Sequence, residues 1–318
     1  MKRLITIILI SLMLVGCEQK ESNNVYKIGV LQLADHPSLD ATYDGLVAVL
    51  DEKIGKDNYV IDYQNAMGEQ SNVQVMAQKL ADDGNDVIYA IATNAAQAVY
   101  ATAEETGTPV VFNAVTDPVE AGLVESMDVP GKHATGVSDV APIDIQLALI
   151  KEMLPDVENI GILYNTGEAN SRVQVAIAEE EAAKIGLTIV AQGVSNASEI
   201  ETATVQLAEN VDAIYNITDN MVVTATAQVT SIASDANVPV FAAEVGQLDQ
   251  GILATDSIDY HNLGRLGGAI VVDILVNGTN PADIPVKTVT ETVLYINRDV
   301  AESLGITLSD AILERAQQ

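Results

Sequence analysis

The sequence predicts an α/β protein in which two Rossmann-like lobes face each other across a hinged cleft. From Tyr26 onward, short runs rich in β-branched residues alternate with longer segments of helical periodicity, which is typical of parallel sheets covered by helices. The alternation then occurs a second time, with matching local sequence. The chain of 318 residues is also long enough for two domains of ordinary size.

The first half of the chain contains four predicted strands separated by three predicted helices. Each strand is a short run rich in β-forming residues, and each helix is a longer segment with a helical pattern. The strands cover residues 26–32, 59–65, 87–92 and 109–115, and the helices cover residues 39–54, 71–83 and 94–106.

The second half repeats this order. The strands cover residues 159–165, 187–193, 212–218 and 239–244, and the helices cover residues 170–185, 198–209 and 220–236. Residues 86–89 (DVIY) correspond to 212–215 (DAIY), and the strand start at 108–112 (TPVVF) corresponds to 238–241 (VPVF). Several such matches in the same order indicate two copies of one domain fold, because the repeating unit is far longer than that of a solenoid.

Three segments are predicted to cross between the lobes. Residues 134–144 lead into a helix at 145–154, residues 255–260 lead into an amphipathic helix at 262–277, and residues 284–297 form a last strand region before a helix that begins near Asp299. We therefore expect the N-terminal lobe to comprise residues 26–140 and 256–285. The C-terminal lobe then comprises residues 141–255 and 286–318.

The N-terminus has the features of an export signal. Two basic residues precede an apolar run at 4–15, and Leu14-Val15-Gly16-Cys17 matches the bacterial lipobox. We expect residues 1–16 to be a lipoprotein signal peptide, Cys17 to carry the lipid (palmitate included), and residues 17–25 to be a flexible tether. The alternative is a short membrane anchor, but about 12 apolar residues are too few to span a bilayer. The expected location is the outer face of the cell membrane or the periplasm.

Composition narrows the possible partners. Forty-five acidic residues against 15 basic ones give a formal net charge of −30, so nucleic acid and anionic lipid surfaces repel the protein. Two explanations of this acidity are open. The acidic residues form a solvated surface that suits a salty extracellular environment, or they attract cationic ligands. Cys17 is the only cysteine, so the folded part has no disulfide. The chain has no Trp and two Phe, which disfavours a sugar site built on stacked rings.

Polar residues follow most of the predicted strands, at the edge where ligands bind to parallel sheets. Asp117, Asp219 and Glu244 can accept hydrogen bonds from an ammonium group. At predicted helix starts, free backbone N–H groups can bind a carboxylate, and these positions carry Asn94, Asn170, Ser171 and Asn220. The same residue types also cap helices without binding anything. As a set, they favour a zwitterionic ligand such as an amino acid.

Catalytic motifs are missing from the sequence. His36, His133 and His261 are far apart and do not have metal-ligand spacing. There is no Gly-x-Ser-x-Gly elbow and no phosphate-binding loop. We therefore expect no enzyme activity, no cofactor and no metal site.

Several segments together resemble the ABC-transporter substrate-binding lipoproteins of the tryptophan/tyrosine type. They are residues 34–40 (ADHPSLD), 116–119 (TDPV), 164–171 (YNTGEANS), 218–220 (TDN), 259–264 (DYHNLG) and 297–306 (NRDVAESLGI). The resemblance implies a type I periplasmic-binding fold, in which a monomer closes on its ligand and delivers it to a membrane permease. It implies an aromatic amino acid (tryptophan, tyrosine or phenylalanine) as the ligand.

The resemblance also implies roles for individual residues. The helix start at Asn170-Ser171 and the pair Thr93-Asn94 would hold the ligand carboxylate, whereas Asp117 and Asp219 would hold its amine. His36, Pro37 and Leu39, which follow the first predicted strand, would flank the side chain of the ligand. The complete expected set is His36, Pro37, Leu39, Thr93, Asn94, Thr116, Asp117, Asn170, Ser171, Asp219, Asn220 and Glu244.

Two alternatives to an aromatic amino-acid receptor remain at this point. The first is a receptor for another small polar solute, such as a branched-chain amino acid, a nucleoside or a sugar. The second is a surface lipoprotein that signals or adheres through protein contacts. In each case we expect no binding to nucleic acid. We expect contact with the membrane only through the lipid anchor.

Overall fold

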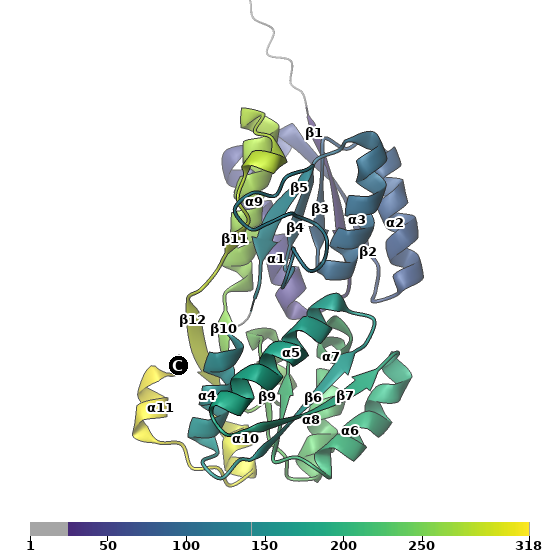
Figure 1. Cartoon of the computed structure of the whole chain (residues 1–318). Coiled ribbons are helices and arrows are strands. Elements are labelled where there is room, and N and C mark those ends of the chain that lie inside the picture. The colour runs from purple at the N-terminus through teal and green to yellow at the C-terminus, as the bar shows by residue number, and fades with distance from the viewer. Residues whose placement is uncertain (1–24, 141, 318) are drawn as a thin grey trace, which may run out of the picture.

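A computed structural model describes residues 25–140 and 142–317 and confirms two α/β lobes, each built on a six-stranded sheet (Figure 1). The expected signal peptide, Cys17 and nearly all of the tether lie outside the described residues. None of the helices in the described part of the chain is long and apolar enough to span a membrane.

The first lobe has an entirely parallel sheet with helices on both faces. In sheet order its strands are β11 (Lys287–Thr288), β5 (Ala134–Ser138), β4 (Val110–Asn113), β3 (Val87–Ile91), β1 (Tyr26–Gln32) and β2 (Tyr59–Asn65). The helices α1 (Pro37–Lys53) and α9 (Tyr260–Asn277) pack together, as do α2 (Gln70–Asp82) and α3 (Thr93–Thr106). Short 3₁₀ helices lie at Lys56–Asn58 and Pro281–Asp283.

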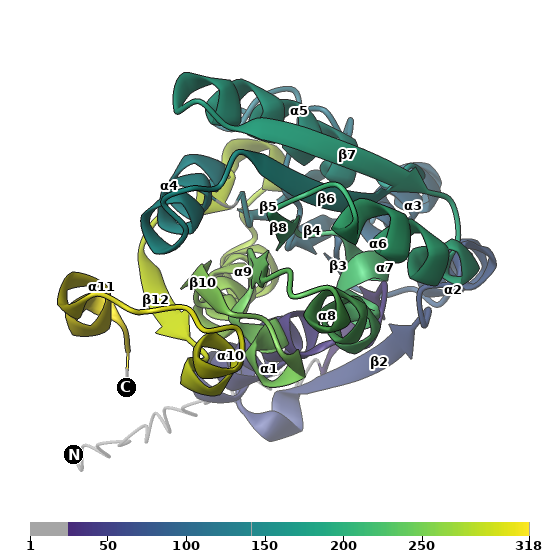
Figure 2. The same ribbon diagram turned by 90° about the horizontal axis from the view of Figure 1, so that it is seen from below.

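The second lobe has the same strand order, except that its edge strand is antiparallel. The order is β12 (Thr292–Ile296), β10 (Ala254–Ile258), β9 (Val240–Ala242), β8 (Ala213–Asn216), β6 (Asn159–Asn165) and β7 (Thr188–Val194). The pairs α4 (Ile143–Met153) with α5 (Ala169–Lys184), and α6 (Ile200–Ala208) with α8 (Thr226–Asp235), pack on this sheet (Figure 2). The remaining helices are α7 (Asn220–Thr224), α10 (Arg298–Ser303), α11 (Asp310–Arg315) and the 3₁₀ helices η2 (Ala197–Glu199) and η3 (Val245–Gln250).

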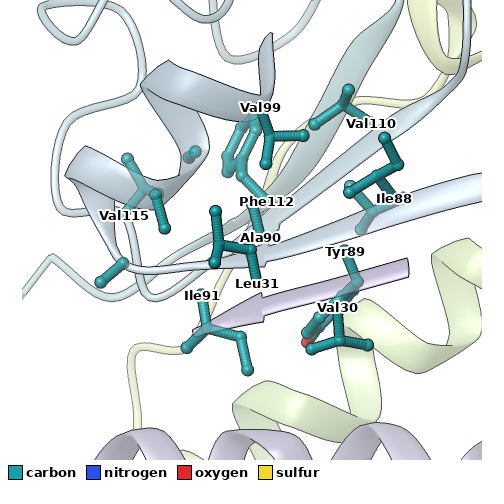
Figure 3. Packing of buried hydrophobic residues seen from close by; sticks show 14 of the residues in the cluster. Val30, Leu31, Ile88, Tyr89, Ala90, Ile91, Val99, Val110, Phe112 and Val115 are labelled. Atoms are coloured by element: carbon teal, nitrogen blue, oxygen red, sulfur yellow. The ribbon is translucent and has the colours of Figure 1, made fainter. Parts of the chain in front are cut away.

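Apolar side chains fill both faces of the first sheet. Leu31, Ile88, Tyr89 and Phe112 are fully buried, and Val99 of α3 packs with them (Figure 3). A strand with helices on both sides is apolar along its whole length, which explains the continuous apolar runs of the sequence. Burying each such side chain stabilises the fold by about 1.5–3 kcal/mol. The strand ends are therefore held rigidly.

Glycines allow α9 to return to the first lobe and pack on α1. A Cβ on Gly45 would lie 2.2 Å from the carbonyl oxygen of His261, and one on Gly264 would lie 2.1 Å from that of Thr42. No other residue permits such close approach of two helix backbones. This contact joins a segment from the second half of the chain to the first lobe.

Two crossings between the lobes lie a few residues later than the expected boundaries. Strand β10 pairs in the second sheet as far as Ile258, whereas the expected boundary followed residue 255. Strand β11 pairs with β5 of the first sheet, whereas residues from 286 onward were expected in the second lobe. Both strands are short and partly polar, so their pattern does not show which sheet they join. The expected helix at 220–236 is also divided at Ala225, and α11 was not expected.

Candidate functional site

The loops that follow the parallel strands of the two sheets meet between the lobes. His36 follows β1, and its Nε2 lies 3.4 Å from Oδ1 of Asn220, which follows β8 in the other lobe. Thr116 follows β4, and its hydroxyl lies 3.4 Å from that of Thr218. Parallel sheets bind ligands at this edge. The candidate site is therefore formed by loops from both lobes.

Glu244 is the acidic group in this region with an unused oxygen. The residue is 3% exposed, and its Oε2 has no hydrogen-bond partner among the described residues. The nearest basic atom is Nδ1 of His36, at 3.9 Å, and that atom also has no hydrogen-bond partner. Burial raises the pKa of Glu244 to about 7 and lowers the pKa of His36. The lowered pKa favours a neutral imidazole, which leaves the carboxylate unneutralised.

Glu168 is buried at the start of α5, and its bonds join this helix to α7. Its carboxylate accepts hydrogen bonds from the side chains of Asn165 (3.2 Å), Asn170 (3.2 Å) and Asn220 (2.6 Å). It also accepts from the backbone N–H groups of Asn220 and Met221. The sequence-based set did not include Glu168. The signal for it was its place two residues before a predicted helix, in the segment 164–171 that carries part of the family resemblance.

Asp219 caps the start of α7. Its Oδ1 accepts from the backbone N–H of Val222 at 2.9 Å, and its Oδ2 accepts from the hydroxyl of Ser171 at 2.7 Å and from the backbone N–H of Asn165. The residue is fully buried, and burial beside Glu168 raises its pKa. Both oxygens are thus engaged within the second lobe. This geometry does not support the expectation that Asp219 binds the ligand amine.

Asp117 is also engaged by its own loop. Its Oδ1 accepts from the backbone N–H groups of Val119 at 3.1 Å and Glu120 at 2.9 Å. The helix-cap explanation therefore describes Asp219 better than the amine-binding role that the resemblance implied, and Oδ1 of Asp117 stabilises a turn of its own loop.

Asp139 is a further buried acid, in the first crossing between the lobes. It accepts from the hydroxyl of Thr116 at 3.1 Å and from the hydroxyl of Tyr260, the first residue of α9, at 3.2 Å. Burial, and to a smaller degree the nearby Glu244, raise its pKa to about 6. Asp139 was not predicted, although it lies in a segment recognised as a crossing. It links two of the connections on which the lobes can turn.

The helix starts in the cleft are only partly capped. Helix α3 follows Ala92, which has φ = +80°, and has no side-chain cap; Thr93 at its start is 2% exposed. Helix α5 also has no side-chain cap on its N-terminus. The Asn170 amide donates to the Thr218 carbonyl at 2.8 Å, while its Oδ1 has no partner among the described residues. Free N–H groups at such ends attract anions.

The other predicted residues do not form hydrogen bonds between the lobes in the described part of the chain. Leu39 is buried in the apolar core of the first lobe. Pro37 is exposed as the first residue of α1. Asn94 is half-buried and donates to Gln70 of α2 at 3.3 Å.

Buried carboxyl groups without a basic partner are the main electrostatic feature of the site. No Lys or Arg among residues 25–140 and 142–317 forms an ion pair with Asp139, Glu168, Asp219 or Glu244. The described residues also contain no cluster of His, Cys, Asp and Glu that could hold a metal ion. Such a site favours an organic cation, because an ammonium ion would offset the charge.

The cavity of about 480 Å³ in the second lobe lies away from these residues. It is lined by Pro155, Asp212 and Leu304, among others, near the amino ends of the strands. None of its lining residues carries a buried polar side-chain atom that lacks a partner. The interlobe site therefore has the stronger chemical features for recognition.

Comparisons with known proteins agree along nearly the whole chain. The family model of ABC transporter substrate binding proteins matches residues 27–318. The tyrosine-binding protein of Clostridioides difficile (strain R20291) is 38% identical over 308 residues, which cover 92% of this chain and 88% of that protein. The crystal structure of an ABC domain in complex with L-Trp from Streptococcus pneumoniae has a TM-score of 0.89 and 37% identity, and covers 92% of this chain and 99% of that one.

A second solved structure differs in the arrangement of its lobes. The ligand-free, open structure of a substrate-binding protein with adhesive properties from Clostridium difficile is 38% identical over 92% of this chain and 98% of that one, but its TM-score is 0.70. Identity and coverage hardly differ from those of the L-Trp complex, so similarity of sequence does not explain the lower score. The lobes of this protein are arranged more like those of the complex. The chain belongs to the family of ABC transporter substrate-binding proteins.

Proposed function

We propose that this protein binds an aromatic amino acid (tyrosine, tryptophan or phenylalanine) between its lobes for an ABC importer. Two relatives support this ligand class, because one is named for tyrosine and the other was solved with L-Trp. Binding proteins of this family work with a membrane permease, which would receive the ligand.

The unpartnered carboxylate of Glu244 is the observation that carries the proposal. It is buried between the lobes, faces no fixed cation, and lies 3.9 Å from a histidine whose pKa is lowered. A ligand ammonium ion would supply both the missing hydrogen-bond donor and the missing positive charge. Charged hydrogen bonds of this kind contribute about 1.5–3 kcal/mol. We therefore assign the amine to Glu244 in place of Asp117 and Asp219.

The ligand carboxylate would bind at the helix starts on the other side of the site. Thr93 begins α3 in the first lobe, and Asn170 and Ser171 lie in the first turn of α5 in the second lobe. Helices α3 and α5 contact each other. The positive ends of both helix dipoles would then act on one anion. His36 at the start of α1 is the candidate to flank the aromatic ring.

Binding would be coupled to closure of the lobes. A ligand that touches Glu244 and Asn170 in one lobe and Thr93 and His36 in the other makes its full set of contacts only when the lobes are closed. Such a ligand shifts the equilibrium toward the closed form by its extra contacts there. The permease would distinguish the two forms by shape.

The proposal also covers the oligomeric state, the lack of catalysis and the attachment to the membrane. We propose a monomer with no catalytic activity, because the site is built from buried caps and carboxylates without an aligned nucleophile and base. We propose attachment to the outer face of the membrane through lipidated Cys17. Mass spectrometry of the protein from its native membrane should show an acyl mass on this residue. An unmodified thiol at Cys17 would contradict the anchor.

A thermal-shift screen of the purified protein tests the ligand class. A ligand at a hundred times its Kd stabilises the folded protein by about 2.7 kcal/mol. We expect L-tyrosine, L-tryptophan or L-phenylalanine to raise the melting temperature, while branched-chain amino acids, nucleosides and sugars leave it unchanged. The matched control is tyramine, which keeps the ring and the amine but lacks the carboxylate. A shift only with a sugar or nucleoside would refute the proposal.

A further inference from the structure

Gly246 of η3 lies in close contact with the first lobe. A Cβ placed on Gly246 would lie 2.9 Å from Oγ of Ser38, 3.0 Å from Cβ of Pro37 and 3.3 Å from the backbone N of Ser38. All three atoms belong to the start of α1 in the first lobe, whereas Gly246 belongs to the second. Among the glycines of the described residues, Gly246 alone has all its nearest atoms across the cleft.

The backbone of Gly246 does not itself require glycine. Its φ is outside the left-handed region, unlike that of Gly251 at the end of the same 3₁₀ helix, where φ is +94°. Alanine would therefore fit Gly246 within its own lobe. The need for glycine arises only when α1 of the other lobe comes close. Pro37 is a rigid ring and Ser38 presents a backbone atom, so neither can easily make room.

The contact lies next to the proposed amine site. Glu244 is two residues before Gly246, and His36 directly precedes Pro37. The Oγ of Ser38, the Nδ1 of His36 and the Oε2 of Glu244 all lack hydrogen-bond partners among the described residues. The contact between α1 and η3 therefore lies beside three buried polar atoms that a ligand could satisfy.

We propose that Gly246 determines how far the lobes close, and that a side chain there holds the site partly open. This inference rests on the proposed function, because it requires that ligand binding closes the lobes. The higher TM-score with the L-Trp complex than with the open relative supports the closed arrangement in which the contact exists. Gly246 acts as a positioning residue, since its effect passes through α1.

The test compares Gly246→Ala with Gly161→Ala by calorimetry, thermal unfolding and small-angle X-ray scattering. Overpacking typically weakens a tight contact by about five- to 150-fold, so we expect Gly246→Ala to bind L-tyrosine or L-tryptophan at least about fivefold more weakly. Its melting temperature without ligand should equal that of the wild type. At saturating ligand its radius of gyration should stay above that of the wild type.

Gly161→Ala is the matched control, because its added methyl group meets Leu207 of the same lobe at 2.8 Å. It should lower the melting temperature but leave affinity and compaction unchanged. If Gly246→Ala binds and compacts like the wild type, the inference is overturned. Weaker binding with full compaction also overturns it, because the methyl group would then act on the ligand directly. If the wild type binds no aromatic amino acid, the proposed function fails and the inference fails with it.

Discussion

Replacing Glu244 with glutamine tests the central electrostatic feature of the site. The substitution keeps the size of the side chain and removes the charge. Burial raises the pKa of this carboxyl from 4.5 to about 7, which corresponds to about 3 kcal/mol for holding the ionised form in the closed site. A ligand ammonium ion would offset this free energy. A glutamine at this position does not have the free-energy cost of a buried charge in the ligand-free protein. It also lacks the negative charge that would attract the ammonium ion of the ligand.

We expect the Glu244→Gln protein to bind L-tyrosine about 10- to 100-fold more weakly than the wild type at about pH 8, because a charged hydrogen bond is lost. The pH dependence gives a second measure. An ammonium ion beside Glu244 favours its ionised form, so binding lowers the pKa of this group. Wild-type affinity should then be constant above about pH 7 and fall by about tenfold per pH unit below it.

Isothermal titration calorimetry in two buffers of different ionisation enthalpy measures both effects. Near pH 6 the wild type should release protons on binding, and the Glu244→Gln protein should release far fewer. The matched control is Asp117→Asn, because Asp117 is bound by its own loop amides and should not affect the affinity. The reasoning is refuted if Glu244→Gln binds as tightly as the wild type at pH 8, or if wild-type affinity does not change between pH 8 and 5.5.

Three further substitutions test the structure itself. Asp219→Asn should lower the free energy of unfolding by about 1–3 kcal/mol, measured with urea, because an amide cannot accept all the hydrogen bonds that this buried carboxylate receives. Phe112→Ala should cost about 3–5 kcal/mol in the same assay, since the ring is fully buried; a loss below 1 kcal/mol would mean that the core packs differently. Glu52→Gln removes the exposed ion pair with Arg265, and its melting temperature should match the wild type at physiological salt.

The sequence predicted the elements of the fold more accurately than their connections. Strands 26–32, 59–65 and 159–165 have the expected bounds, because each is a short run rich in β-branched and aromatic residues. Strand β11 has only two residues, both exposed, so hydrophobic patterning could not assign it to a sheet. Its partner β5 comes from a segment about 150 residues earlier, and such a pairing depends on tertiary packing.

The site was predicted by position but not by role. Strand-end loops correctly indicated where polar groups would lie between the lobes, as His36, Thr116 and Asn220 show. Whether an acid caps a helix or faces a ligand depends on where its oxygens point, and sequence does not contain that information. Asp219 follows one predicted strand and Glu244 ends another, yet Asp219 is bound by backbone amides and Glu244 has an oxygen without a partner.

The acidity of the site also explains how capture and closure can depend on each other. Closing the lobes without a cation buries Glu244 close enough to Asp139 and Glu168 for their charges to raise the pKa values of Asp139 and Glu244. Each buried charge would then oppose closure, so under the proposed function the open form is favoured while no ligand is bound. The proposed amino-acid ligand would reverse this balance, because its ammonium ion is attracted most strongly where the surrounding protein excludes water. The same carboxylates would therefore keep the empty protein open and hold the loaded protein closed, a difference that a permease can recognise.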